Sequence, residues 1–198
     1  MAFYEYYDAY NKIFDSEEHS KGIEDVWTHI GDSKFEFGKM VHATTTSTFI
    51  IGPNLAFLSK EENKKDMKEL LFEKFRANPK FEIRMLILDD SVKVFKPWTE
   101  DAKASDYKFN VRVTNVLNFS LIFRDESTPE GCVLVTPIPN GCEGANRSCF
   151  LVKKKIYEKA FCKHYDEYNK IFNSQEDSKG IEDVWAQMED HEKLDINK

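Results

Sequence analysis

The sequence predicts an α/β protein with a mixed β-sheet flanked by helices and a duplicated helical hairpin at each end of the chain. Three observations predict it: a long internal repeat, a helical segment between two β-branched apolar runs, and a later series of short strands separated by turn residues. The 198 residues suffice for one sizeable domain, and the 41% hydrophobic content, with 16 Phe, supplies its core.

The two ends of the chain are nearly the same sequence. Residues 2–30 recur without a gap at 160–188, and the run SKGIEDVW is unchanged at 20–27 and 178–185. A match of this length with a tryptophan in register indicates a duplication. Two explanations stay open. In the first, the duplicated unit is the helical segment itself. In the second, which we favour, the unit is 31–188 and the opening segment is the tail of a preceding unit.

Each copy of the repeat is predicted to form a helical hairpin. Apolar residues three and four apart predict the first helix, a Ser/Asp/Glu-rich break follows at Ser16 and Ser174, and Ser20 and Ser178 suit the N-cap of the second helix. The expected domains are a hairpin at 1–30, an α/β domain at 31–188 that ends in the second copy, and a polar tail at 189–198. The apolar positions are Tyr7, Tyr10, Ile13, Phe14, Ile23, Val26, Trp27 and Ile30, with Tyr165, Tyr168, Ile171, Phe172, Ile181, Val184, Trp185 and Met188.

The middle of the chain begins with a β-α-β pattern. Residues 47–51 are β-branched and apolar and stop at Gly52-Pro53, which predicts a strand and a turn. Residues 63–77 have helical spacing. Residues 81–88 form a nearly continuous apolar run, as expected for a parallel strand covered on both faces.

The remaining segments predict further strands, which make the sheet a mixed one that contains antiparallel strands. The polar stretch 97–106 is expected to be irregular. The turn-rich segment Asp125–Gly131 predicts a hairpin loop, and a helix is expected from about Lys154 into the second repeat copy. Strands are predicted at 110–116, 119–123, 132–136 and 150–152.

Composition and motifs exclude several classes of protein. The net charge of −7 makes nucleic acid an unexpected partner. No pair of cysteines has C-x-x-C spacing, and no phosphate loop, H-E-x-x-H helix or EF-hand pattern occurs, so we expect no metal and no cofactor. The sequence shows no signal-peptide pattern and no long apolar stretch. We therefore expect a cytoplasmic location and no membrane insertion.

The order of the elements resembles one half of the phospholipase D-like fold, over roughly residues 34–185. The resemblance rests on a strand that ends at Ile51-Gly52, a helix, a strand that closes in Leu88-Asp89, further strands and a terminal helix rich in aromatic residues. That family carries a His-x-Lys-x4-Asp motif. Here the same spacing reads Asn118-x-Ser120-x4-Asp125.

The resemblance implies a fold without its usual reaction. In enzymes of the family the histidine attacks phosphorus and forms a covalent intermediate, and the lysine neutralises phosphoryl charge. Asparagine cannot act as that nucleophile and serine carries no positive charge, so no catalytic residue is assigned. The candidate ligand contacts are the motif positions and asparagines near strand ends: Asn118, Ser120, Asp125, Asn140 and Asn146.

The sequence therefore favours a non-catalytic ligand-binding, regulatory or assembly module. Two halves of the phospholipase D-like fold normally face each other, so a chain with one half is expected to form a homodimer or homo-oligomer. Two alternatives stay open. One is a phosphodiesterase or nuclease-type hydrolase that uses other residues, and the other is a structural unit of a tandem-repeat protein.

Overall fold

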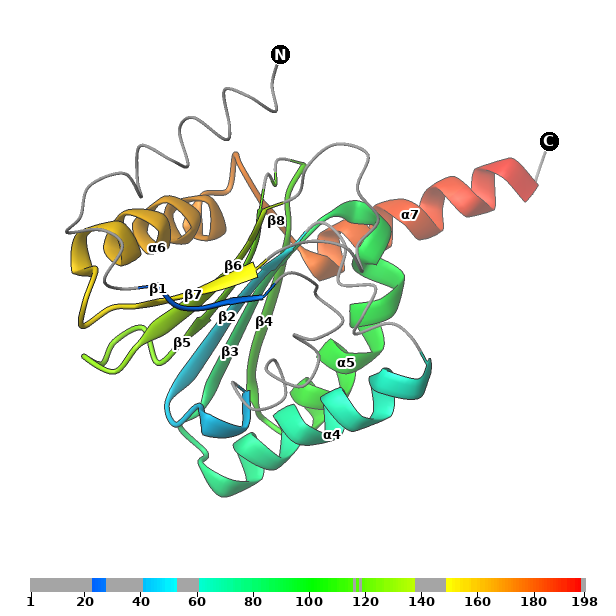
Figure 1. Ribbon diagram of the computed structural model, residues 1–198. Helices are drawn as coiled ribbons and strands as arrows, with labels where there is room; N and C mark the ends of the chain where they lie inside the picture. Colours follow the sequence, from blue (N-terminus) through cyan, green and yellow to red (C-terminus); the bar gives the residue numbers. More distant parts are fainter. Residues whose placement is uncertain are drawn as a thin grey trace, which may run out of the picture.

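An eight-stranded mixed sheet with helices on both faces is the framework of the structure (Figure 1). The computed structural model describes residues 23–27, 41–52, 61–115, 117, 119–137 and 149–196. The strand order is β1-β7-β6-β5-β2-β3-β4-β8, which confirms the predicted α/β class. The strands are β1 (Ile23–Trp27), β2 (Ser47–Gly52), β3 (Glu82–Ile87), β4 (Lys108–Val113), β5 (Phe119–Arg124), β6 (Cys132–Pro137), β7 (Cys149–Lys153) and β8 (Lys179–Gly180). The helices are α4 (Glu61–Ala77), η2 (Asp89–Ser91), α5 (Val92–Ala104), α6 (Glu158–Asn173) and α7 (Ile181–Ile196).

The predicted β-α-β unit is present at the centre of the sheet. Strands β2 and β3 pair in parallel from Ser47 opposite Glu82 to Gly52 opposite Ile87, and β4 pairs in parallel with β3. Helix α4 makes the crossover between β2 and β3. All six residues of β2 are buried, as expected for a strand covered on both faces.

Strands β5, β6 and β7 extend the sheet in antiparallel fashion, as predicted. Strand β5 pairs with β2 on one side and with β6 on the other. The β2–β5 pairing continues beyond β5, because the Asp125 N–H donates to the Ser47 carbonyl at 2.9 Å. The turn that follows joins β5 to β6, which places Asp125 where the sheet meets the hairpin loop.

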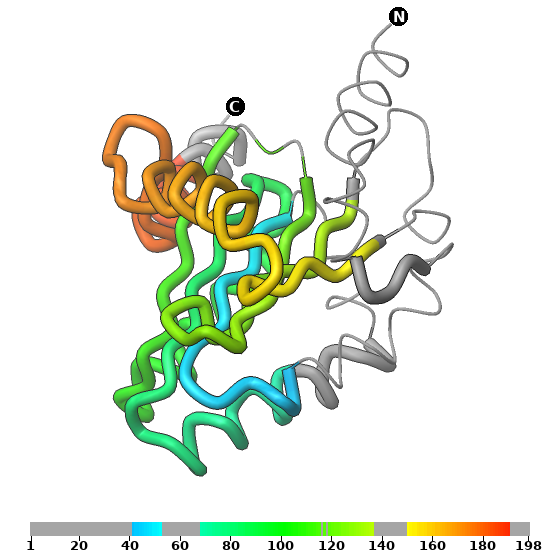
Figure 2. Tube along the Cα trace, turned by 60° about the vertical axis from the view of Figure 1, so that its left-hand side comes forward, coloured from blue at the N-terminus to red at the C-terminus, as the bar shows by residue number. Residues whose placement is uncertain are grey.

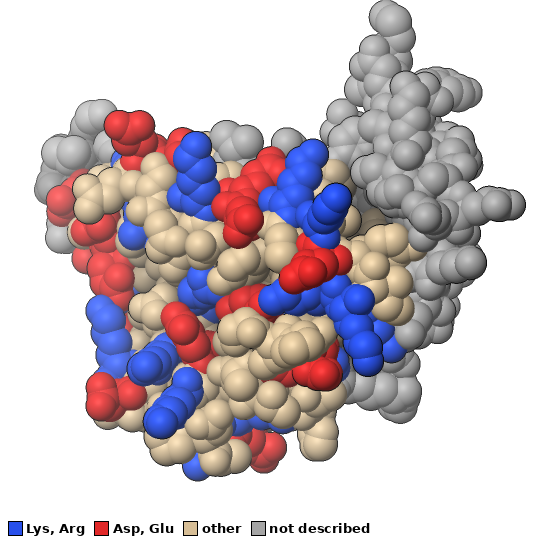
Figure 3. Space-filling model, turned by 90° about the vertical axis from the view of Figure 1, so that its left-hand side faces the viewer, with Lys and Arg blue, Asp and Glu red and all other residues tan. Residues whose placement is uncertain are grey.

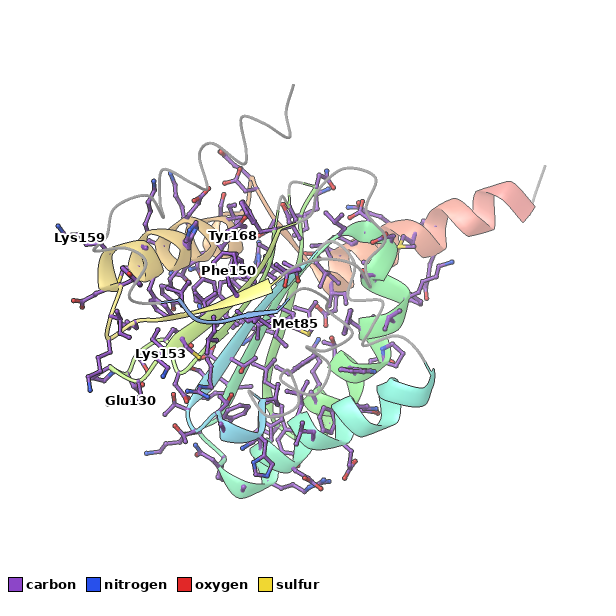
Figure 4. The ribbon with its side chains drawn as sticks, viewed as in Figure 1. Met85, Glu130, Phe150, Lys153, Lys159 and Tyr168 are labelled. Carbon is purple, nitrogen blue, oxygen red and sulfur yellow. The ribbon has the colours of Figure 1, made fainter. Side chains whose placement is uncertain are left out.

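Two apolar layers cover the two faces of the sheet. Helix α6 lies across one face, where Phe49, Phe123 and Tyr168 are buried (Figure 2). Helices α4, α5 and α7 cover the other face, where Met85 is buried. Figure 4 shows Tyr168 between α6 and the sheet and Met85 on the opposite side. Alternation along the strands sends successive side chains to different layers.

The second repeat copy forms the two predicted helices, but they do not pack together as a hairpin, because α6 covers one face of the sheet and α7 covers the other. Helices α6 and α7 are separated by the turn after Asn173 and by the two residues of β8. Helix α6 begins at Glu158, four residues later than expected, because the chain turns at Lys154–Ile156 and the Tyr157 N–H donates to the Lys153 carbonyl.

The first repeat copy departs from the prediction. Ile23–Trp27 was expected to be helical, but it forms strand β1, which pairs antiparallel with β7. The same pentapeptide, IEDVW, begins helix α7 at Ile181. Its Ile, Val and Trp suit a strand as well as an amphipathic helix, so the surroundings decide between the two. The rest of this copy lies outside the described residues.

The stretch 97–106 is helical at its start, and the prediction of an irregular segment was wrong. Helix α5 runs through Pro97, which lies on its exposed side. A proline inside a helix removes one backbone hydrogen bond. The helix forms nevertheless because residues at helical spacing are buried against the sheet: Val92, Phe95, Trp98, Thr99 and Ala102.

Candidate functional site

Asp125, one of the predicted ligand contacts, has its carboxylate surrounded by backbone donors. Its Oδ1 accepts hydrogen bonds from the Thr46 N–H at 2.7 Å and the Thr46 hydroxyl at 2.8 Å. The Thr45 N–H lies 3.0 Å from Oδ1 and 3.1 Å from Oδ2, and the Ser47 N–H lies 3.4 Å from Oδ1. The carboxylate therefore fixes the turn that leads into β2.

The ionised form of Asp125 is the one that this turn binds. Burial raises the pKa of Asp125, but the hydrogen bonds from Thr46, Thr45 and Ser47 outweigh it, and the pKa lies below its ordinary value. The backbone of Asp125 has a positive φ of 48°, a conformation that Asp adopts more readily than most residues. The lowered pKa and the positive φ both indicate that the Asp125 carboxylate has a structural role.

A buried ion pair lies next to Asp125 on the α6 face of the sheet. The Arg84 guanidinium in β3 contacts the Glu126 carboxylate at 2.6 Å, with the two side chains 12% and 8% exposed. Arg84 also donates to Tyr165 Oη at 2.8 Å and to Asn169 Oδ1 at 2.7 Å, both in α6. Glu126 accepts from the Ser47 hydroxyl at 2.7 Å. The pair and its hydrogen bonds thus join β3, the start of β2 and the residue after Asp125 to helix α6.

Aromatic rings enclose the Arg84 guanidinium. Its centre lies 4.6 Å from the Phe49 ring centroid, 5.5 Å from that of Tyr165 and 5.8 Å from that of Phe172. The guanidinium is therefore held by three hydrogen bonds and by the faces of three aromatic rings. We name Arg84, Glu126, Tyr165 and Asn169 the α6 anchor.

Sequence reasoning missed the α6 anchor, although one signal was available. Arg84 lies between Ile83 and Met85 in a strand that is covered on both faces, and a charge in the middle of such a strand needs a buried partner. The partners lie 42 and 81 residues away in the chain, so no local pattern identifies them.

The structure places the two described motif residues at opposite ends of β5. Ser120 pairs with Thr136 near the start of the strand, whereas Asp125 follows its last residue. Five residues of extended chain separate them by roughly 16 Å. Ser120 shares with Ile122 the sheet face away from α6. The other predicted contacts, Asn118, Asn140 and Asn146, lie outside the described residues, and their binding role stays a prediction.

The side chains of two histidines, His164 and His42, are described. His164 in α6 is half-buried, with its ring centroid 6.4 Å from that of Phe119. Burial lowers the pKa of His164, so the neutral imidazole predominates at pH 7. Phe119 packs in the α6 layer, so His164 lies across the sheet from Ser120. His42 is exposed.

The surface over α6 and the β5–β6 hairpin carries charges of both signs. Figure 3 shows Lys and Arg interspersed with Asp and Glu on this face. Among the described residues no group of three or more His, Cys, Asp or Glu is arranged to hold a metal ion. None of the described helices is long and apolar enough to cross a membrane.

Comparison with known proteins yields structural neighbours at low identity. No protein-family model and no curated protein matches the chain. The fold is similar to that of phosphatidylserine synthase from Haemophilus influenzae, with a TM-score of 0.59 and 10% identity over 79% of this chain and 38% of that one. It is also similar to TrmBL2, an archaeal chromatin protein that binds DNA, with a TM-score of 0.52 and 11% identity over 84% of this chain and 60% of that one.

These neighbours define the class of fold. The chain is an α/β protein whose mixed sheet and flanking helices are compatible with a phospholipase D-like fold. It spans less than two thirds of the length of either neighbour. One fold serves an enzyme in one neighbour and a chromatin protein in the other, so the fold alone leaves the function open.

Proposed function

We propose that this chain is a non-catalytic phospholipase D-like module that acts by binding, as a regulatory or assembly unit. The observation that carries the proposal is the state of the motif. Its first two positions are Asn118 and Ser120, and its third, Asp125, is engaged by the backbone of Thr45–Ser47 roughly 16 Å from Ser120. Neither a nucleophilic histidine nor a phosphate-binding lysine stands at the motif.

The chromatin neighbour supports a role without catalysis. It shows that this kind of fold occurs in a protein described by its DNA binding. DNA itself is not our expected ligand, because the chain carries a net charge of −7 and the face in Figure 3 has no field of one sign. A protein partner fits better, and a second copy of the chain is the simplest one.

A panel of phosphodiesters tests the proposal. The full chain would be incubated at micromolar concentration with bis(4-nitrophenyl) phosphate, phosphatidylcholine vesicles and single-stranded DNA. We expect no product above the protein-free blank. Product that increases with protein concentration, and that Ser120→Ala abolishes without lowering the melting temperature, would overturn the proposal.

Light scattering tests the assembly part. We expect a mass of twice the 23.2 kDa of one chain, or a higher multiple. A single-chain mass over the whole micromolar range would contradict self-assembly while leaving the absence of catalysis intact.

A hydrolase remains the second candidate, and His164 is the observation that favours it. Its half-buried, neutral imidazole lies near Phe119, inside the motif. Its position on the α6 face, away from Ser120, weighs against a shared site. The first copy has Tyr6 at the position equivalent to His164. We expect the His164→Tyr variant to give the same phosphodiester assay result as the unmodified chain.

A further inference from the structure

The buried residues that hold the second repeat copy on the sheet all recur in the first copy. The rings that α6 buries, Phe161, Tyr168 and Phe172, are matched by the same residue types in the first copy, and so are the two anchor residues of α6. Ser178, whose hydroxyl accepts from Arg112 Nε at 2.8 Å, is matched as well. In the order of the chain, the matching residues are Phe3, Tyr7, Tyr10, Asn11, Phe14, Ser20, Ile23 and Val26.

The differences between the copies lie away from these contacts. No residue that is buried in the second copy differs in the first. Three half-buried positions differ, namely Cys162, His164 and Met188. The remaining differences fall on exposed residues of the second copy: Lys163, Glu167, Asn173, Gln175, Asp177, Ala186 and Gln187. The first copy therefore carries the full set of buried groups for the same docking site.

The structure also provides two places for two copies. The second copy covers one face of the sheet through α6 and the other through α7, and the backbone of Ile23–Trp27 in the first copy pairs with the edge of β7. The segment IEDVW adopts both conformations, strand in one place and helix in the other. Exchange of equivalent elements between copies of a chain is a low-cost route to dimers.

We infer that the surface covered by residues 160–188, on both faces of the sheet, is a docking site for residues 2–30 of a second copy of this chain. Within one chain, β1 and β8 lie at opposite edges of the sheet. Seven strand spacings separate them, roughly 30 Å, whereas a second chain can present its first copy from outside. The inference rests on the repeat and not on the proposed lack of catalysis, so an experiment can contradict one of these claims without contradicting the other.

An ion pair on α7 provides a direct readout. Lys103 Nζ in α5 lies 2.6 Å from Glu182 Oε1, and both side chains are solvent-accessible at 63% and 43% exposed. The residue equivalent to Glu182 in the first copy is Glu24, which lies in β1, across the sheet. A zero-length carbodiimide joins a lysine only to a carboxylate in contact with it. A Lys103–Glu24 cross-link therefore reports the first copy in the place of the second.

The experiment uses the full chain, mixed from ¹⁵N-labelled and unlabelled protein, cross-linked and digested. The two glutamates fall in distinguishable peptides because Thr28 replaces Ala186. We expect Lys103–Glu24 links that combine one labelled and one unlabelled peptide. In Phe172→Ala, which weakens the second copy only, the ratio of Lys103–Glu24 to Lys103–Glu182 links should rise about tenfold or more.

Matched variants keep the test decisive. Phe14→Ala should abolish the Lys103–Glu24 link, and Lys163→Ala, at an exposed position of α6, should leave the ratio unchanged. Lys103–Glu24 links that never mix isotopes would place the exchange inside one chain and overturn the inference. So would their complete absence from both the unmodified chain and Phe172→Ala.

Discussion

The Oδ1 atom of Asp125 accepts a 2.7 Å hydrogen bond from the backbone N–H of Thr46, a residue 79 positions earlier in the chain. This bond and its neighbours tie the end of β5 to the start of β2, where the antiparallel and parallel parts of the sheet meet. The Asp125 carboxylate is thus part of the framework of the sheet.

The first prediction concerns the loss of this carboxylate. Asp125→Ala leaves the N–H groups of Thr45 and Thr46 without their acceptor, and removing a charged hydrogen-bond partner from a buried site costs about 3 kcal/mol. We expect the free energy of unfolding in urea to fall by about that amount. A change below about 0.5 kcal/mol would show that water replaces the carboxylate and that the turn does not depend on it.

The second prediction follows from the lowered pKa of Asp125. The native pKa lies below the unfolded value of about 3.9. The unfolded chain therefore binds the proton first, and the stabilisation is complete above about pH 5 and is lost as pH falls through the native pKa. The Asp125→Asn variant has no carboxylate to titrate at this position, so it shows no such loss of stability. The stability difference between the two proteins should narrow between about pH 5 and pH 3, and a constant difference would contradict the assignment.

The third prediction concerns the buried ion pair. Glu126→Ala leaves the Arg84 charge in an apolar layer and should cost about 3 to 5 kcal/mol. Replacing both residues, as Arg84→Met with Glu126→Leu, removes the uncompensated charge and should cost less than the single change. A double-mutant cycle in urea measures the coupling. Additive effects would show that the pair does not act as a unit.

The fourth prediction uses two glycines as a matched pair. A Cβ on Gly131 would lie 2.8 Å from the backbone oxygen of Asp125, whereas one on Gly180 would meet first the side-chain oxygen of Asp183, at 3.1 Å. Backbone cannot move aside, but a side chain can. Gly131→Ala should lower the free energy of unfolding by about 2 kcal/mol, and Gly180→Ala by clearly less. Equal losses would contradict the geometry of the β5–β6 hairpin.

Most of the sheet was predictable because its signals are local. The apolar run before Gly52-Pro53 and the apolar strand that ends at Ile87 have the lengths and turn residues of strands, and the structure confirms both. Helix α5 was missed because Pro97 looks like a break when its buried neighbours cannot be seen. Tertiary contacts overrode the local signal.

The candidate site was predictable only as a set of positions. The spacing from Asn118 to Asp125 predicted a motif, but the hydrogen bonds that engage Asp125 come from Thr45–Ser47, far away in the chain. The repeat shows the same limit. IEDVW is a strand at Ile23 and a helix at Ile181, so its conformation depends on its neighbours in space and not on its own sequence.

The absence of phosphodiester chemistry is tested most directly on the protein itself. The full chain would be mixed with excess bis(4-nitrophenyl) phosphate and quenched, and both the released nitrophenolate and the intact protein mass would be measured. We predict no release above the blank and an unchanged mass. Nitrophenolate release together with a phosphoryl adduct that maps to a histidine, with His164 the first to inspect, would contradict the account.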